Sequence, residues 1–141
     1  MNQNDIKKKV RWLFDTNSII KIVKHESIEI FEILKSMKNL NYISKITVLE
    51  YPKSSKTYEI FNIIDLNQQI TDIALKIILN LRKIGELVPI SDVLIMSSAE
   101  YHEIPLIISD DNHFQIMKKY VIHSKNVISL HDFGKKLISK V

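Results

Sequence analysis

Pro105-Leu106-Ile107-Ile108-Ser109-Asp110-Asp111 is a short apolar run that ends in two carboxylates. A second run, Val10-Arg11-Trp12-Leu13-Phe14-Asp15, has the same form. Runs of this length and composition predict buried strands of a parallel sheet. Ligands of open α/β sheets bind at the carboxyl ends of the strands, so we expect these acids to face one site.

Strand-like and helix-like patterns alternate along the rest of the chain. We expect strands at residues 11–14, 42–43, 58–64, 106–108 and 127–130, and helices at 27–40, 46–51, 67–84, 93–101, 114–120 and 132–140. Residues 15–18 are expected to form a turn, residues 53–56 a polar loop, and Ser91 the cap of its helix. This order predicts one domain over residues 1–141, a three-layer α/β/α sandwich with a mainly parallel central sheet.

Composition limits the function classes. The chain has no cysteine, which excludes disulfides and thiolate chemistry, and only two glycines, which disfavours an all-β sandwich. No apolar stretch approaches a membrane span, and residues 1–9 do not resemble a signal peptide, so we expect a cytoplasmic protein that does not bind membranes. The net charge of +4 suits a polyanionic partner, but it fits a generally lysine-rich composition equally well.

Several carboxylates lie within apolar sequence. They are Asp15, Glu50, Asp92 and the pair at 110–111. Taken singly, each also fits a helix cap, an exposed helical acid or a turn residue. Together they predict one acidic pocket, and hard oxygen ligands without cysteine favour Mg²⁺ or Mn²⁺ over zinc. The five histidines show no metal-pair spacing, and His113 is the one candidate for lining that pocket.

Four segments in this order resemble the PIN domain, and most of all its small VapC-type members, the toxins of toxin–antitoxin pairs. The segments are 13–17, 46–50, 91–99 and 106–114, and the resemblance covers nearly the whole chain. Asp15 matches the acid after the first strand, Glu50 the glutamate of a Thr-x-x-Glu helix, and Asp92 the acid that opens a later helix.

The last segment matches the family pattern Thr-x-Asp-x-Asp-Phe when it is aligned on Phe114. Ser109 then takes the hydroxyl position and Asp111 the position of the metal-binding acid. Asp110 falls at a variable position. His113 replaces the second aspartate, and this departure removes one acid from the family pattern.

The resemblance implies a metal-dependent endoribonuclease that cleaves single-stranded RNA with Mg²⁺ or Mn²⁺. It assigns metal binding and water activation to Asp15, Glu50, Asp92 and Asp111, with supporting roles for Thr16, Asn17, Ser109, Asp110 and His113. It also implies a homodimer and an antitoxin that blocks the acidic pocket.

Two alternatives remain open: an RNA-processing PIN nuclease without an antitoxin, and a catalytically silent nucleic-acid-binding module. An aspartyl phosphatase is disfavoured, because Asn17 stands where that class needs a second aspartate.

Overall fold

The computed structural model describes residues 10–25, 28–57 and 59–139. Predictions for residues 1–9 and for Ser27, Tyr58 and Lys140 lie outside these ranges. Five parallel strands form the sheet in the order β3-β2-β1-β4-β5. Their bounds are β1 Trp12–Phe14, β2 Asn41–Ser44, β3 Asn62–Ile64, β4 Leu106–Ile108 and β5 Asn126–Ile128. The predicted parallel sheet is confirmed.

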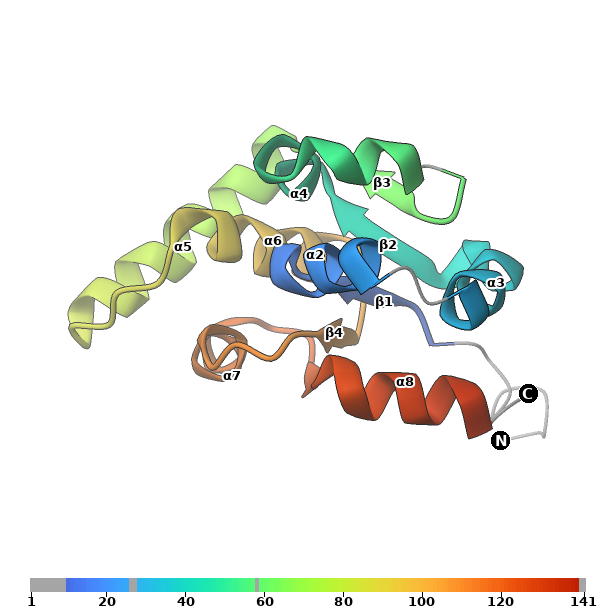
Figure 1. The fold of residues 1–141 in the computed structure, drawn as a ribbon. Helices are drawn as coiled ribbons and strands as arrows, with labels where there is room; N and C mark the ends of the chain where they lie inside the picture. Colours follow the sequence, from blue (N-terminus) through green and yellow to red (C-terminus); the bar gives the residue numbers. More distant parts are fainter. Residues whose placement is uncertain (1–9, 26–27, 58, 140–141) are drawn as a thin grey trace, which may run out of the picture.

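Helices cover both faces of this sheet (Figure 1). One face packs against α5 (Gln68–Lys83), α6 (Ile90–Tyr101) and α7 (His113–Met117). The other packs against α2 (Thr16–His25), α3 (Ile28–Ser36) and α8 (Leu130–Ser139). Successive side chains of a strand point to opposite faces of the sheet. Leu13 of β1 therefore packs into the core beneath α5, α6 and α7, whereas Trp12 and Phe14 pack into the core beneath α2, α3 and α8. The predicted α/β sandwich is therefore confirmed.

Strand order places a crevice between β1 and β4. From β1 the chain adds β2 and β3 on one side, and β4 then returns to the other side of β1. Helices leave neighbouring strands in opposite directions at such a switch point, which is where open sheets bind ligands. Asp15 follows β1 and Ser109 follows β4, so both residues stand at this crevice.

The helix α2 was not predicted. The sequence indicated only a turn at residues 15–18, but Asp15 caps a helix whose Ile19 and Ile22 are buried against β1 and β4. Ser91 is not a cap, because α6 already begins at Ile90 after Pro89. Asp92 consequently lies in the first turn of α6.

Other boundaries differ by a few residues. The loop predicted at 53–56 is the 3₁₀ helix η2 (Pro52–Thr57), and α4 spans Lys45–Glu50 with Ser44 as its cap. The third strand begins at Asn62, four residues later than predicted, and Phe61 just before it is buried in an edge-to-face pair with Phe14. Shorter 3₁₀ turns, η1 (Lys38–Leu40) and η3 (Lys118–Tyr120), end the helical regions predicted at 27–40 and 114–120.

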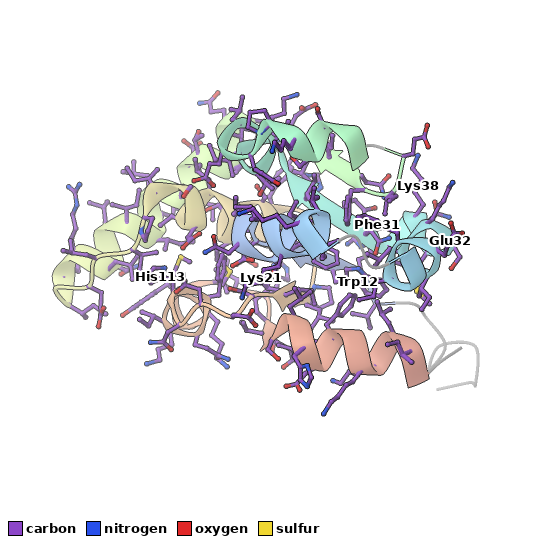
Figure 2. The ribbon with its side chains drawn as sticks, viewed as in Figure 1. Trp12, Lys21, Phe31, Glu32, Lys38 and His113 are labelled. Carbon is purple, nitrogen blue, oxygen red and sulfur yellow. The ribbon has the colours of Figure 1, made fainter. Side chains whose placement is uncertain are left out.

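Gly85 and Trp12 stabilise two local parts of this fold. Gly85 ends α5 with φ +72°, and Glu86 N–H donates to Leu81 O in the pattern that glycine favours at helix ends. Trp12 (Figure 2) belongs to the core. Its indole N–H donates to Asn41 Oδ1, and its ring forms an edge-to-face pair with Phe133. No helix in the described parts of the chain is long and apolar enough to span a membrane.

Candidate functional site

Asp15 is held rigidly at the end of β1. It is 2% exposed, and its Oδ1 accepts a hydrogen bond from Ser18 N–H at 2.8 Å. Its Oδ2 accepts another from Ser109 Oγ at 2.6 Å. Burial raises the pKa of Asp15, although the hydrogen bonds from Ser109 and Ser18 oppose that rise. The carboxylate is therefore fixed in position while its negative charge is poorly compensated.

Ser109 joins the ends of β1 and β4. Its hydroxyl donates to Asp15 and accepts the backbone N–H of Asp111 at 2.9 Å. One hydroxyl group thus sets the spacing between two acids that are far apart in sequence.

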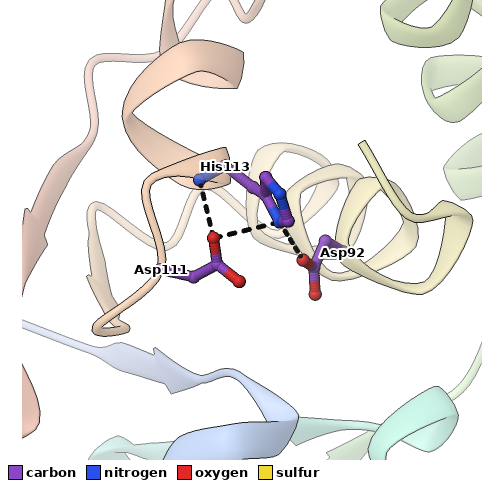
Figure 3. A group of neighbouring side chains, drawn as sticks. All are labelled: Asp92, Asp111 and His113. Carbon is purple, nitrogen blue, oxygen red and sulfur yellow. Dashed lines mark hydrogen bonds and ion pairs between the residues drawn. The ribbon is translucent and has the colours of Figure 1, made fainter. Parts of the chain in front are cut away.

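Asp92 and Asp111 lie beside each other across the imidazole of His113 (Figure 3). His113 Nδ1 is 2.8 Å from Asp92 Oδ2 and 3.0 Å from Asp111 Oδ1. Burial raises the pKa of Asp92, the hydrogen bond from His113 lowers it, and the charges of Asp111 and Asp15 raise it further. The mutual repulsion of Asp15, Asp92 and Asp111 indicates that they form one electrostatic group.

Glu50 lies at the rim of this group. It is exposed at the end of α4, where its Oε1 accepts a hydrogen bond from Thr16 Oγ1 at 2.7 Å. The hydroxyl groups of Thr16 and Thr47 are 3.0 Å apart. Thr16 follows Asp15 directly, so this contact directs Glu50 toward the same end of the sheet. The sequence prediction did not include Thr47, although its place in the Thr-x-x-Glu spacing was a usable signal.

Asp110 lies apart from the group. Its carboxylate pairs with Lys21 Nζ at 2.7 Å and accepts Leu130 N–H at 3.0 Å. The hydrogen bond from Lys21 is the main reason that the pKa of Asp110 is lowered. Asn17 lines a hollow of about 370 Å³ beside Asp110 and Asp111. The sequence prediction missed Lys21, which lies on the unpredicted helix α2 (Figure 2).

The donor set suits a divalent cation. Within the described ranges, no Lys or Arg forms an ion pair with Asp15, Glu50, Asp92 or Asp111. Carboxylates that repel one another are costly where no lysine or arginine compensates their charge, and a hard cation with oxygen ligands relieves that cost. Asp92, Asp111 and His113 each offer one ligand atom, and the three atoms lie within 4.8 Å of one another.

Comparison with known proteins agrees with this fold. A model of the PIN domain family matches residues 12–120. The fold is similar to a chain of DNA-bound VapBC from Salmonella typhimurium, with a TM-score of 0.69 and 16% identity over 86% of this chain and 99% of that chain. A chain of VapBC2 from Rickettsia felis, bound to a promoter DNA fragment, gives a TM-score of 0.64 and 17% identity, covering 85% and 98%.

A third structure, VapBC-1 from nontypeable Haemophilus influenzae, gives a TM-score of 0.64 and 19% identity, covering 86% of this chain and 99% of that chain. At these identities the likeness is one of fold. No curated protein sequence matches the chain.

Proposed function

Because the chain belongs to the PIN-domain family of nucleases, we propose that it is a metal-dependent endoribonuclease that cleaves single-stranded RNA. The observation that carries this proposal is the hydrogen-bonded link from Asp15 through Ser109 to Asp111, with Asp92 facing the same group. Acids from the ends of β1 and β4 and from α6 are thereby collected at the switch point of the sheet.

Asp15, Glu50, Asp92 and Asp111 are the proposed ligands of Mg²⁺ or Mn²⁺. A bound divalent ion lowers the pKa of a water molecule and stabilises the leaving oxygen of a phosphodiester. Ser109 holds Asp15 and Asp111 at a fixed spacing, and Thr16 orients Glu50. Asn17 lines the hollow beside Asp111, which supports a role for its amide in contacting the phosphate backbone.

We further propose that the chain acts as one PIN-like domain, the toxin of a toxin–antitoxin pair in the cytoplasm. The similarity of its fold to chains of VapBC complexes supports an antitoxin partner. A homodimer is supported by apolar side chains that α5 and the segment after it expose. These are Leu75, Leu79, Ile84, Leu87 and Ile90. The net charge of +4 is compatible with a polyanionic substrate such as RNA.

Two neighbouring aspartates provide a matched test of the site. Asp111→Asn is expected to reduce cleavage of a single-stranded RNA with Mn²⁺ by at least about tenfold, because it removes a proposed ligand. Asp110→Asn is expected to leave cleavage within about twofold of wild type, because Asp110 faces Lys21 and its pair is exposed.

Initial rates measured on a fluorescently labelled RNA, with and without EDTA, separate these outcomes. An equal loss of RNA cleavage in both variants would contradict the assignment of Asp111 as a metal ligand. Binding of RNA without cleavage by the wild-type protein would instead indicate a silent nucleic-acid-binding module.

A further inference from the structure

His113 brings a nitrogen atom into a group of oxygen ligands. It is the first residue of α7, its side chain is 29% exposed, and its ring lies between Asp92 and Asp111 (Figure 3). The atom that faces both carboxylates is Nδ1, at 2.8 and 3.0 Å.

These separations match those between neighbouring ligands of one ion. An octahedral ion with bonds of about 2.1 Å holds adjacent ligand atoms about 3.0 Å apart. The two measured distances are close to this value, and all three donor atoms lie within 4.8 Å of one another. Nδ1 therefore stands where a third ligand of the ion would stand.

The imidazole is not needed to position Asp111. The backbone N–H of Asp111 is held by Ser109 Oγ, and Asp111 Oδ1 accepts the backbone N–H of His113 at 3.1 Å. Both contacts survive replacement of the imidazole. Substituting this side chain therefore changes one donor atom while the loop that carries Asp111 keeps its hydrogen bonds.

Ligand type determines which ion such a site prefers. Mg²⁺ favours oxygen ligands, whereas imidazole nitrogen suits the later first-row ions, and affinity rises from Mn²⁺ to Co²⁺ and beyond. Resting on the function proposed above, we infer that His113 Nδ1 is a metal ligand. This nitrogen shifts the preference of the site away from Mg²⁺ and toward transition-metal ions such as Co²⁺ and Mn²⁺.

The test measures ion affinity independently of catalysis. Isothermal titration calorimetry with Mg²⁺, Mn²⁺ and Co²⁺ compares wild type, His113→Asp and His113→Asn, with circular dichroism confirming the fold of each. The ratio of Mg²⁺ to Co²⁺ dissociation constants is expected to fall by at least about tenfold in His113→Asp, since even partners outside the ligand shell change metal affinity by tenfold to a hundredfold. His131→Asn, a change at an exposed histidine of α8, is expected to leave that ratio unchanged.

A spectroscopic measurement identifies the atom. In ¹H–¹⁵N spectra of the imidazoles, Zn²⁺ is expected to shift the Nδ1 resonance of His113 and to leave the Nε2 resonance nearly in place. A shift confined to Nε2, or to another histidine, would overturn the assignment.

The remaining outcomes separate this inference from the proposed function. If His113→Asp keeps the wild-type ratio, the inference fails even if both proteins cleave RNA. If His113→Asn binds every ion more tightly by the same factor, the imidazole competes with the ion, and the inference fails as well. If wild type binds none of the three ions, the proposed metal-dependent function fails together with it.

Discussion

Asparagine in place of Asp15 is expected to reduce RNA cleavage by at least about a hundredfold and to raise the melting temperature in EDTA by a few degrees. The loss follows from removing the most buried of the proposed ligands, since even outer partners of metal ligands are worth tenfold to a hundredfold. The gain follows from removing a charge whose burial raises its pKa. A few degrees is roughly the effect of 1 kcal/mol in a chain of this length.

The gain in stability depends on pH. Because the pKa of Asp15 is raised on folding, its contribution to stability is fully present below the ordinary aspartate value of 3.8. That contribution is lost as the pH rises through the folded-state pKa. Asp15→Asn is therefore expected to be more stable than wild type at pH 7 and to have no advantage below about pH 3.8.

Differential scanning calorimetry over a range of pH, with and without Mn²⁺, measures both the gain in stability and its dependence on pH. The asparagine oxygen can still accept Ser18 N–H, so the start of α2 is preserved. Saturating Mn²⁺ at about a hundred times its dissociation constant is expected to stabilise wild type by about 2.7 kcal/mol and the variant far less. A variant that cleaves RNA normally, or that Mn²⁺ stabilises equally, would refute the role of Asp15.

The second large effect concerns a buried ionic cluster at the end of α6, away from the proposed metal site. Glu100 is 6% exposed and accepts hydrogen bonds from the backbone N–H groups of Ile122 and His123. It also contacts His123 Nδ1 at 2.8 Å and Lys125 Nζ at 3.2 Å. The side chain of Lys125 has no exposed area, so Glu100 is the carboxylate that compensates its charge.

Glu100→Gln is expected to lower the free energy of unfolding by about 3 kcal/mol, because it leaves the buried Lys125 ammonium without an opposite charge. Glu103→Gln is the matched control. Glu103 contacts Nε2 of the same His123, but its side chain is 65% exposed, so its loss is expected to cost less than about 1 kcal/mol. Urea denaturation of the three proteins measures the difference. Equal stabilities for the two variants would contradict this account of the cluster.

Measuring stability at low pH provides a second test of the contribution of Glu100. Burial alone would raise its pKa, but the hydrogen bonds from Ile122, His123 and Lys125 outweigh burial and lower it below 4.5. Its contribution to stability is therefore present above pH 4.5 and is lost as the pH falls through the lower, folded-state pKa. As the pH falls from 4.5 through the folded-state pKa of Glu100, the difference in free energy of unfolding between wild type and Glu100→Gln is expected to decrease.

The sequence predicted the strands better than the helix that carries the site. The strand predicted at 106–108 is observed at those residues. A short, buried apolar run bounded by polar residues is too short for a helix and is typical of a strand. The helix α2 was missed since Asp15, Thr16, Asn17 and Ser18 are all typical of turns. The β-branched residues that follow, such as Ile19 and Ile20, have low helix propensity, although the i, i+3 spacing of Ile19 and Ile22 was a usable helical signal.

For the site, the sequence predicted the acids but not their contacts. The rule that ligands gather at strand ends brings Asp15 and Asp111 together, and the alignment on Phe114 separates Asp111 from Asp110. The pairing of Asp110 with Lys21 needs α2, which was not predicted. The bridge from His113 to Asp92 depends on how α7 packs against α6, and such a distance is set by tertiary packing alone.

The order in which the ribosome makes these segments has a consequence for the cell. Asp15, Glu50 and Asp92 leave the exit tunnel before Ser109, whose hydroxyl joins the ends of β1 and β4. A growing chain that stops short of Ser109 and Asp111 carries three of the acids and lacks both the residue that spaces them and the fourth. On the function proposed above, nascent and truncated products that end before Asp111 are therefore expected to lack nuclease activity.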